Sequence, residues 1–403
     1  MKTAGRNVEL DHLLGRLSEA TRLLPVLTAP NAAEERRRLS RCVSRCERAE
    51  PRWWWVRRDL GRAPRVWLEG GRRRAADSPA SALYLRRLDE IEHDLAILDA
   101  LGDARRIPPL VARRFGTPSM SVTTERGPAP LGRVARRLLR TVPDTAEPQV
   151  LPADDPNPQT PSVARLMRSM ARAAGLDVRV TVEPRLAAAA AAGNRTVLLA
   201  DRCFGGREAV RLAVHEILGH LVSAANGRAQ PLRIVELGTA GSFADQEGLC
   251  ILLEESAGVL DGRRLRTLAA RVVAAECMHE GATFHETARL LVDEHGFEPA
   301  DAVTIGERAY RGGGVARDVS YLAGWLRVRA AVGASEATIA DLQLGRVSLA
   351  ELPTLRALQA GGLVRPPVYR PSLSRSLRST HSGTSFQTSP PSDAASFTRF
   401  EAT

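Results

Sequence analysis

Two histidines and a glutamate lie close together in an apolar, helix-like stretch of the chain: His215, Glu216 and His220. Imidazole nitrogens are good zinc ligands, and a carboxylate next to the first histidine can accept a proton from water at the metal. The spacing reads His-Glu-x-x-x-His, which is one residue longer than the common His-Glu-x-x-His. These residue types point to metal-assisted hydrolysis, provided that the chain can bring both imidazoles to one ion.

The extra residue sets a geometric condition on the helix. Residues five apart on a regular α-helix lie about 140° apart around the axis, whereas residues four apart lie about 40° apart. One turn with i→i+5 hydrogen bonding would return His215 and His220 to one face, and such turns concentrate at functional sites. Gly219 supplies the backbone freedom for that widening or for ending the helix there. The alternative is that the two histidines fell in one helix by chance, since the chain has eight histidines in 403 residues.

A catalytic zinc site needs a third protein ligand, and a downstream segment offers acidic candidates. A helix that begins near Asp245 would present Glu247 in its first turn, after the glycine-containing loop 237–242. Alternatively, these two acidic residues only complement the helix dipole. Glu254 and Glu255 are rival ligands, which we rank lower because they lie deeper in what reads as an ordinary amphipathic helix.

Residues 246–250 read Gln-Glu-Gly-Leu-Cys, and together with the histidine motif they resemble a known family. This is the QEGLC-motif family, whose bacterial members are called flavohemoglobin expression-modulating proteins. Its eukaryotic relatives are the microtubule-associated tyrosine carboxypeptidases, which remove the C-terminal tyrosine of α-tubulin. The resemblance implies one zinc ion per chain, held by His215, His220 and Glu247, with Glu216 as general base.

The resemblance extends from about residue 80 to residue 371. Further similar segments are residues 101–119, 308–322, 344–348 and 361–367. Arg317 and Arg346 depart from the family, which usually has lysine at both positions. The resemblance therefore covers most of the chain and not one motif alone.

The hydrophobic pattern predicts an α+β fold that is mostly helical. Residues 178–182 and 196–200 read as strands, and the alanine run 187–192 reads as a short helix or a hairpin arm. A zincin-like metallopeptidase core, with this small sheet beside the histidine helix, is then expected. The sheet edge beside that helix would let an extended peptide add as a strand.

The same pattern divides the chain into four expected regions. They are a helical N-terminal region (1–140), a Pro-rich loop or linker (141–160), a zinc metallopeptidase-like catalytic region (161–364) and a disordered Ser/Thr/Pro-rich tail (365–403). All the positions that we single out for chemistry lie in the third region.

Other side chains could serve a hydrolytic site. Tyr321 is a candidate donor to the oxyanion, although it could equally be a packed core residue. A carboxypeptidase must bind a free C-terminal carboxylate, which the planar arginine side chain matches well. Arg308, Arg311 and Arg317 lie around the glycine-rich loop 312–314, which could fold over the site, and we favour Arg311 and Arg317.

Composition limits the partners. The net charge is +11, but Lys2 is the only lysine among 57 basic residues, so 56 are arginine. That skew is typical of a biased genome composition, so we expect no nucleic-acid partner but an attraction for acidic peptide tails. Five cysteines, an odd number, predict reduced thiols in a cytoplasmic protein, and no apolar stretch is long enough to span a membrane. The oligomeric state is not indicated.

These observations leave three hypotheses. The first is a zinc metallopeptidase, most plausibly a carboxypeptidase acting on a peptide or protein C-terminus. The second is a regulatory or binding protein whose zinc site is structural or vestigial. The third is a zinc amidohydrolase that acts on a non-peptide amide. The bacterial-type chain gives no reason to carry over tubulin as the substrate.

Overall fold

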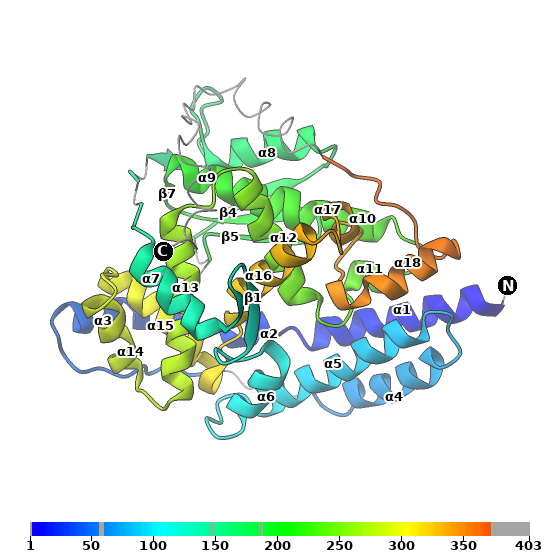
Figure 1. Cartoon of the computed structure of the whole chain (residues 1–403), viewed down its shortest axis with the longest axis horizontal. Coiled ribbons are helices and arrows are strands. Elements are labelled where there is room, and N and C mark those ends of the chain that lie inside the picture. The colour runs from blue at the N-terminus through cyan, green and yellow to red at the C-terminus, as the bar shows by residue number, and fades with distance from the viewer. Residues whose placement is uncertain are drawn as a thin grey trace. The chain divides into compact units, whose positions relative to one another are not determined.

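The chain folds into two compact units, each built from two separate stretches of sequence. Unit 1 comprises Met1–Pro143 and Arg264–Ala323, and unit 2 comprises Asp144–Arg263 and Gly324–Thr403. The computed structural model describes residues 2–371 except 56–59, 146, 149, 185 and 187, together with all side chains in that range beyond residue 7 (Figure 1). The predicted α+β class, mostly helical, is confirmed.

The division into units places one segment differently from the expected regions. Residues 264–323, which the sequence pattern groups with the region 161–364, cluster with the N-terminal stretch. At the other end, residues 365–371 are ordered, because the backbone N–H of Tyr369 donates to Asn226 and that of Arg365 donates to Gln230. The expectation of disorder from residue 365 is therefore wrong for these seven residues. The rest of the expected tail, 372–403, lies outside the described residues.

Unit 1 is built from helices and one hairpin. Its helices are α1 (Lys2–Ala20), α2 (Leu23–Leu27), α3 (Ala32–Ser44), α4 (Ala63–Ala75), α5 (Ser81–Asp99), α6 (Ile107–Phe115), α7 (Leu131–Thr141), α14 (Phe284–Asp293) and α15 (Pro299–Gly314). It also contains most of α13 (Gly262–His279) and the start of α16 (Val319–Gly333). Strands β1 (Ser121–Thr124) and β2 (Gly127–Pro130) form the antiparallel hairpin.

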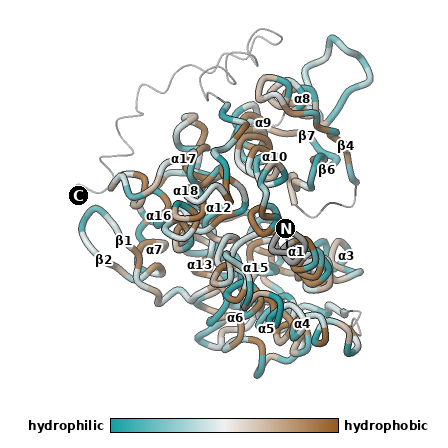
Figure 2. The backbone as a smooth tube through the Cα atoms, turned by 90° about the vertical axis from the view of Figure 1, so that its right-hand side faces the viewer, coloured by the Kyte–Doolittle hydropathy of each residue, from teal (hydrophilic) through white to brown (hydrophobic). Residues whose placement is uncertain are grey.

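Amphipathic patterning explains why these helices pack together. Figure 2 shows hydrophobic and hydrophilic residues alternating along α4 and α5. Several helices also begin with proline in the first turn, where its missing N–H costs no hydrogen bond; α4, α6 and α15 are examples. The sequence thus encodes both the buried face and the starting point of these helices.

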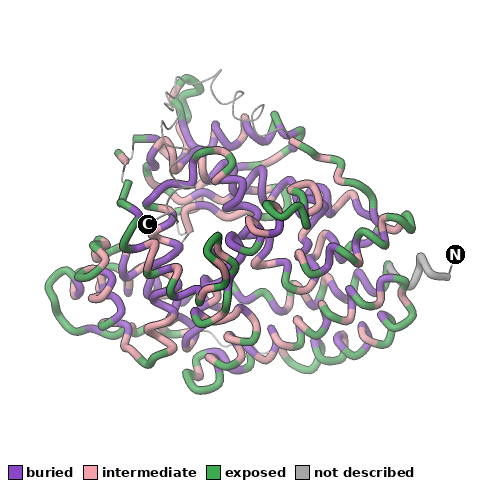
Figure 3. Tube along the Cα trace, in the orientation of Figure 1, coloured by how far each residue is buried: buried purple, intermediate pink, exposed green. Residues whose placement is uncertain are grey.

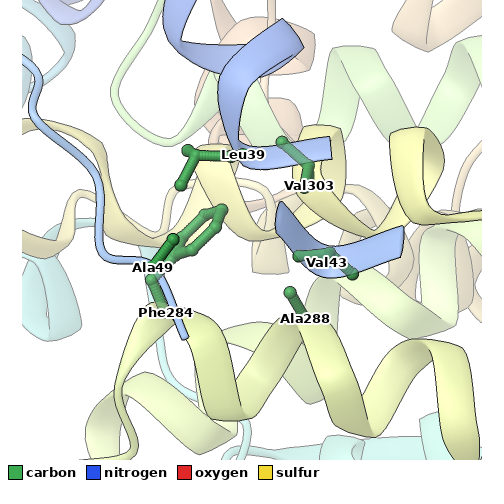
Figure 4. Packing of buried hydrophobic residues seen from close by; sticks show 6 residues of the cluster. All are labelled: Leu39, Val43, Ala49, Phe284, Ala288 and Val303. Carbon is green, nitrogen blue, oxygen red and sulfur yellow. The ribbon is translucent and has the colours of Figure 1, made fainter. Parts of the chain in front are cut away.

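One hydrophobic cluster of unit 1 joins α3, α14 and α15 (Figure 4). Leu39 and Val43, four residues apart on α3, face Phe284 and Ala288 of α14 and Val303 of α15, and all five are at most 1% exposed. Burial of side chains of this size contributes about 1.5–3 kcal/mol for each large aliphatic or aromatic group. The cluster fixes α15, whose C-terminal part carries Arg308 and Arg311.

Unit 2 contains the small sheets. Strands β4 (Arg179–Glu183), β6 (Thr196–Ala200) and β5 (Ala190–Ala192) form one sheet in the order β4-β6-β5. The pair β4–β6 is parallel and the pair β5–β6 is antiparallel. Strands β3 (Leu151–Pro152) and β7 (Cys203–Phe204) form a second, antiparallel pair. Both predicted strands are confirmed to within one residue, and the hairpin-arm interpretation is confirmed for residues 190–192.

The helices of unit 2 carry the histidine motif, and some of them pack against this sheet. They are α8 (Val163–Ala173), α9 (Gly206–Ala213), a π-helix η1 (Val214–Leu221), α10 (Val222–Arg228), α11 (Ile234–Leu237), α12 (Ser242–Ser256), the rest of α16, α17 (Ile339–Leu342), the 3₁₀ turn η2 (Leu349–Glu351) and α18 (Leu352–Ala360). The run from α9 to α10 is almost continuously buried (Figure 3). Strand β5 and α12 both pack against η1. Within the described residues, no helix is both long and apolar enough to cross a membrane.

Candidate metal centre

The histidine motif lies on a π-helix. Residues Val214–Leu221 form η1, and the backbone N–H of Val222 donates to the carbonyl of Ile217, five residues earlier. The widened turn brings the rings of His215 and His220 to a centroid separation of 5.0 Å, with an angle of 77° between their planes. The predicted widening with i→i+5 hydrogen bonding is therefore confirmed.

Gly219 serves a different purpose from the one its sequence position suggests. The helix neither ends there nor adopts a left-handed conformation, because η1 continues directly into α10. A Cβ atom on Gly219 would lie 2.3 Å from Sγ of Cys250, so glycine is required for the close approach of η1 and α12. The alternative that the helix ends at Gly219 is wrong, and close packing is the physical reason for glycine that the structure shows.

Side-chain donors also bond to two carbonyl groups of the π-helix. Nε2 of Gln343 donates to the carbonyl of Leu218 at 2.8 Å, and the hydroxyl of Ser223 donates to the carbonyl of Gly219 at 2.8 Å. Buried carbonyls without partners would cost about 1–3 kcal/mol each. These bonds therefore offset part of the cost of the irregular turn.

Helix α12 brings Glu247 to the histidines. Oε2 of Glu247 lies 3.4 Å from Nε2 of His215 and 3.7 Å from Nε2 of His220. Ligand atoms about 2.1 Å from a tetrahedral zinc ion are separated by about 3.4 Å, so these spacings suit three ligands of one ion. Among the described residues, Oε2 of Glu247 is buried without a hydrogen-bond partner that meets distance and angle requirements. An orphaned carboxylate oxygen that faces two imidazole nitrogens fits a metal ion.

Glu247 lies one turn deeper in its helix than expected. Helix α12 begins at Ser242 and not near Asp245, so Glu247 belongs to the second turn. Helix-dipole effects fall off within the first turn, so they do not account for a buried carboxylate at this position. Asp245 instead pairs with Arg327 and accepts the backbone N–H of Leu349 at 2.8 Å.

The protonation of the three groups is strongly coupled. Burial raises the pKa of the Glu247 carboxyl, but the two histidines outweigh burial and hold this pKa well below its usual value. For His215, burial lowers the pKa, whereas Glu247 and Glu254 raise it to a net value of about 9. The site therefore favours positive charge, whether a proton or a cation supplies it.

A second grouping shares the two histidines. His215, His220 and Cys250 offer ligand atoms that all lie within 4.8 Å of one another, so these three residues could also hold a metal ion. Sγ of Cys250 lies 3.6 Å from Nδ1 of His220, whereas Glu247 faces the Nε2 atom of that ring. The two groupings therefore differ in which edge of the His220 ring faces the third ligand.

The remaining residues of the segment 245–250 hold α12 in place. Nε2 of Gln246 donates to the carbonyls of Leu342 and Gly345, both at 3.1 Å. A Cβ atom on Gly248 would lie 2.3 Å from the carbonyl oxygen of Gly324, so α12 and α16 are in close backbone contact. Every polar or glycine position of this segment thus has a structural or ligand-like contact.

Glu216 lies next to the first histidine within η1 and is 6% exposed. Its charge is one of the interactions that raise the pKa of His215. The exposed fraction of the His220 side chain is larger, at 24%, so the centre faces solvent on the side of His220.

The predicted substrate-binding arginines lie in unit 1, around a buried aspartate. Asp318 is 3% exposed and accepts a hydrogen bond from Arg308. Its carboxylate also lies 3.7 Å from Nη2 of Arg311 and 3.4 Å from Nη1 of Arg271. These three arginines and the charge of Arg317 outweigh burial and lower the pKa of Asp318.

The arginine side chains of this cluster are buried to a degree that is unusual for large cations. Burial and the neighbouring Arg308 lower the pKa of Arg311 to about 10 and that of Arg271 to about 9, although Asp318 opposes the shift. Both side chains are therefore charged at neutral pH. Within the described residues, Nε and Nη2 of Arg311 have no hydrogen-bond partner.

Two further predicted features belong to unit 1. The ring of Tyr321 lies under the guanidinium of Arg271, with 5.5 Å between the guanidinium carbon and the ring centroid. All three glycines of the loop 312–314 have positive φ, and the N–H of Gly102 donates to the carbonyl of Gly312. This loop is thus a fixed turn within unit 1.

Sequence reasoning missed the roles of three residues: Asp318, Arg271 and Glu254. Arg271 carries no local signal, because it is one of many arginines on helical faces. Glu254 was considered only as a rival ligand, yet its Oε1 lies 2.6 Å from Nδ1 of His215. Its position seven residues after Glu247, two turns along the same helix face, was the signal that could have identified it.

The fold and the site define a mostly helical α+β protein with a buried two-histidine centre that could hold a metal ion. Residues 58–389 match the family model of the microtubule-associated tyrosine carboxypeptidases, and the chain belongs to that family. No curated protein gives a significant match to the chain.

Proposed function

We propose that this protein is a zinc-dependent metallopeptidase of the carboxypeptidase type, built on a zincin-like core. The observation that carries the proposal is the convergence of both Nε2 atoms on Glu247, at 3.4 and 3.7 Å. Membership of a family named for tyrosine carboxypeptidases supports the reaction class. The proposed substrate is a peptide or protein with a free C-terminus, and a C-terminal tyrosine is the first residue to test.

The proposed zinc ligands are His215, His220 and Glu247. Glu247 is preferred to Cys250 as the third ligand because its oxygen faces the same edge of both imidazole rings. The thiol of Cys250 lies instead at Nδ1 of His220 and is packed against Gly219. Three protein ligands leave a fourth position open, which is typical of catalytic zinc sites.

The bound zinc would supply Lewis acidity that favours ionisation of a water molecule and polarises the scissile carbonyl. Glu216, adjacent to a ligand histidine, is the proposed general base that accepts the proton of the attacking water. The same carboxyl group would then donate that proton to the leaving amine. Burial of Glu216 keeps this carboxylate away from bulk water, where its interactions would be weaker.

Recognition of the substrate carboxylate is assigned to Arg311 and Arg317, with Arg308 as a further candidate. The unpartnered nitrogens of the buried Arg311 side chain support this role, because a carboxylate could accept from both. Tyr321 is retained as the proposed donor to the oxyanion. Strand β5 is an edge of its sheet within the described residues and packs against η1, which supports strand addition by an extended peptide.

A test of the proposal compares Glu216→Gln with the wild type. Peptides that differ only in their C-terminal residue, each with an amidated counterpart, are incubated with the zinc-loaded protein, and products are identified by mass spectrometry. The wild type should release the last residue of free-acid peptides and leave the amidated peptides intact. Glu216→Gln should retain zinc but lose about 10²–10⁴-fold in rate, which is the usual contribution of a general base.

The matched control is Glu236→Gln, the same chemical change at a residue of α11 that pairs with Arg233. It should hydrolyse peptides at the wild-type rate. Undiminished hydrolysis by Glu216→Gln would overturn the proposed mechanism, and the absence of C-terminal release from every peptide would overturn the carboxypeptidase assignment.

The second candidate function is a regulatory or binding protein with a structural metal site. It is favoured by the possible His215, His220 and Cys250 grouping, because cysteine is a common ligand in structural zinc sites. The cobalt-substituted protein separates the two. A cysteine ligand gives an intense near-ultraviolet charge-transfer band, whereas a two-histidine, one-carboxylate site gives only weak visible bands.

A further inference from the structure

A fully buried carboxylate lies behind the first histidine of the motif. Glu254 of α12 is 0% exposed, and its Oε1 atom lies 2.6 Å from Nδ1 of His215. The opposite nitrogen of the same ring, Nε2, faces Glu247. One helix thus presents two carboxylates to the two edges of one imidazole, and the function proposed above uses only one of them.

The contact fixes the state of the imidazole. An ionised carboxylate is only a hydrogen-bond acceptor, so Nδ1 of His215 must carry the hydrogen of this bond. The lone pair of the neutral ring is then on Nε2, which is the atom that faces Glu247. Histidines that bind metals commonly donate their other ring N–H to a carboxylate, which sets the tautomer and the ring orientation.

Glu254 is poorly placed to be a ligand itself. Its nearest carboxylate oxygen lies at Nδ1 of His215, on the edge of the ring opposite Nε2. An ion between Nε2 of His215 and Oε2 of Glu247 would have the imidazole ring between itself and that oxygen. The geometry therefore separates a ligand carboxylate from a supporting one.

A buried carboxylate requires compensating charge, and Arg211 supplies it. Nη1 of Arg211 lies 3.9 Å from Oε1 of Glu254, and Nη2 lies 3.7 Å from Glu208. Glu208 in turn pairs with Arg202 at 2.6 Å. The charges alternate along this chain, and side-chain exposure falls from 36% at Arg202 to 0% at Glu254.

The chain of charges follows one helical run. Arg211 precedes His215 by four residues, at the junction of α9 with η1, so both side chains lie on similar faces. Glu254 is therefore held between the guanidinium and the imidazole of the same run. The imidazole contact, at 2.6 Å, is the closer of the two and limits the rotation of the Glu254 carboxylate, whereas the guanidinium at 3.9 Å supplies charge.

We propose that Glu254, held by Arg211, is a positioning residue that fixes the tautomer and orientation of His215 for metal binding. The proposal rests on the metal site proposed above, but it concerns affinity for the metal and not hydrolysis. Removal of such a supporting partner typically reduces metal affinity about 10–100-fold.

The test measures zinc affinity by competition with a chromophoric chelator, on the full-length chain and without substrate. Glu254→Gln retains an oxygen acceptor but loses the charge, so it should bind zinc about tenfold more weakly than the wild type. Glu254→Leu removes the acceptor as well and should lose closer to a hundredfold, if it folds. Thermal unfolding of the metal-free proteins reports whether each variant is folded.

The matched control is Glu255→Gln, the same change at the next residue of α12. The Glu255 carboxylate binds the Trp325 indole and Arg329, so its loss should leave zinc affinity at the wild-type value. The visible spectrum of the cobalt-loaded protein gives a second readout, because a merely structural role for Glu254 would leave the coordination bands of Glu254→Gln unchanged.

The possible outcomes separate the two proposals. Equal zinc affinity and equal cobalt spectra for wild type, Glu254→Gln and Glu255→Gln would overturn the positioning role. Failure of the wild type to bind zinc would overturn the proposed function instead. Weaker binding and altered cobalt bands in Glu254→Gln alone would support the inference, even if no hydrolysed peptide has yet been found.

Discussion

Two buried groups of charged side chains, one in each unit, have opposite imbalances of charge. In unit 2, the carboxylates of Glu216, Glu247 and Glu254 are at most 7% exposed and lie around two imidazoles. In unit 1, the carboxylate of Asp318 has four arginines around it, and the buried carboxylate of Glu307 interacts with two of them, Arg308 and Arg311. The first group favours an added cation and the second favours an added anion.

The two groups also differ in how their partners are satisfied. His215 has a contact on each ring edge, from Glu254 at 2.6 Å and from Glu247 at 3.4 Å. Arg311 has an ion pair at 3.7 Å but no hydrogen bond for two of its nitrogens among the described residues. Both edges of one imidazole are thus held in unit 2, whereas in unit 1 Asp318 has a direct hydrogen bond from Arg308 and longer ion pairs with Arg271 and Arg311.

The largest effect on stability is expected for Asp318→Asn. This change leaves Arg308 and Arg311 buried without their carboxylate, and breaking a buried ion pair typically costs about 3–5 kcal/mol. Urea unfolding at pH 7 measures the loss. Asp293→Asn is the control, because Asp293 pairs with Arg289 on the surface and should cost at most about 1 kcal/mol. Equal losses of unfolding free energy in the two variants would refute the claim that Asp318 stabilises the fold more than a surface carboxylate does.

The next largest loss of stability is expected from a substitution at the contact between η1 and α12. In Gly219→Ala the added methyl group would overlap Cys250, and overpacking of this kind costs about 1–3 kcal/mol. Because Cys250 and Glu247 lie on the same helix, zinc affinity should fall as well. Gly206→Ala is a suitable control, since nothing lies within 4 Å of the added atom. Unchanged stability and zinc binding in Gly219→Ala would show that the close approach is unnecessary.

Acidification should affect the arginine cluster through Asp318. The pKa of this carboxyl is lowered in the folded state, because the surrounding arginines outweigh its burial. The stabilisation is therefore complete above the unfolded-state pKa of about 3.9 and is lost as pH falls below it. Unfolding free energies measured between pH 7 and pH 3 should fall more steeply for the wild type than for Asp318→Asn. If the unfolding free energies of the two proteins fell in parallel as the pH is lowered, this account would be contradicted.

The smallest effect, a modest loss of zinc affinity, is expected from a substitution of Arg211, which is one step further along the charge chain from His215 than Glu254. Arg211→Gln keeps a polar side chain near Glu254 but removes the compensating charge. Because the direct bond between Glu254 and His215 remains, zinc affinity should fall by less than the roughly tenfold loss expected for Glu254→Gln. Competition with a chromophoric chelator measures the zinc affinities of both variants and shows which loss is larger. A larger loss for Arg211→Gln would mean that Arg211, and not Glu254, dominates the support of His215.

The proximity of His215, His220 and Glu247 could be predicted from the sequence because its signals are local. The five-residue histidine spacing required an i→i+5 turn, and η1 provides one. Glu247 was identified from a short segment that also resembles a family. The reason for Gly219 was not predictable, because it depends on Cys250, which is distant in sequence and close only after folding.

The unit 1 group could be predicted only in part. Arg308, Arg311 and Arg317 are close together in sequence, but Arg271 comes from α13 and had no distinguishing feature among 56 arginines. The role of Asp318 was also missed, since one aspartate beside an arginine is an ordinary pattern. The joining of residues 264–323 with the N-terminal stretch depends on long-range packing, such as that of Phe284 against α3.

The most direct test of the central claim is the zinc content of the purified protein after loading and exhaustive dialysis. If His215, His220 and Glu247 form the site, the wild type should retain about one zinc ion per chain. Glu247→Gln should retain almost none, while Cys250→Ser should retain nearly as much as the wild type. A wild type without zinc, or a Glu247→Gln variant with full content beside an empty Cys250→Ser variant, would contradict the account.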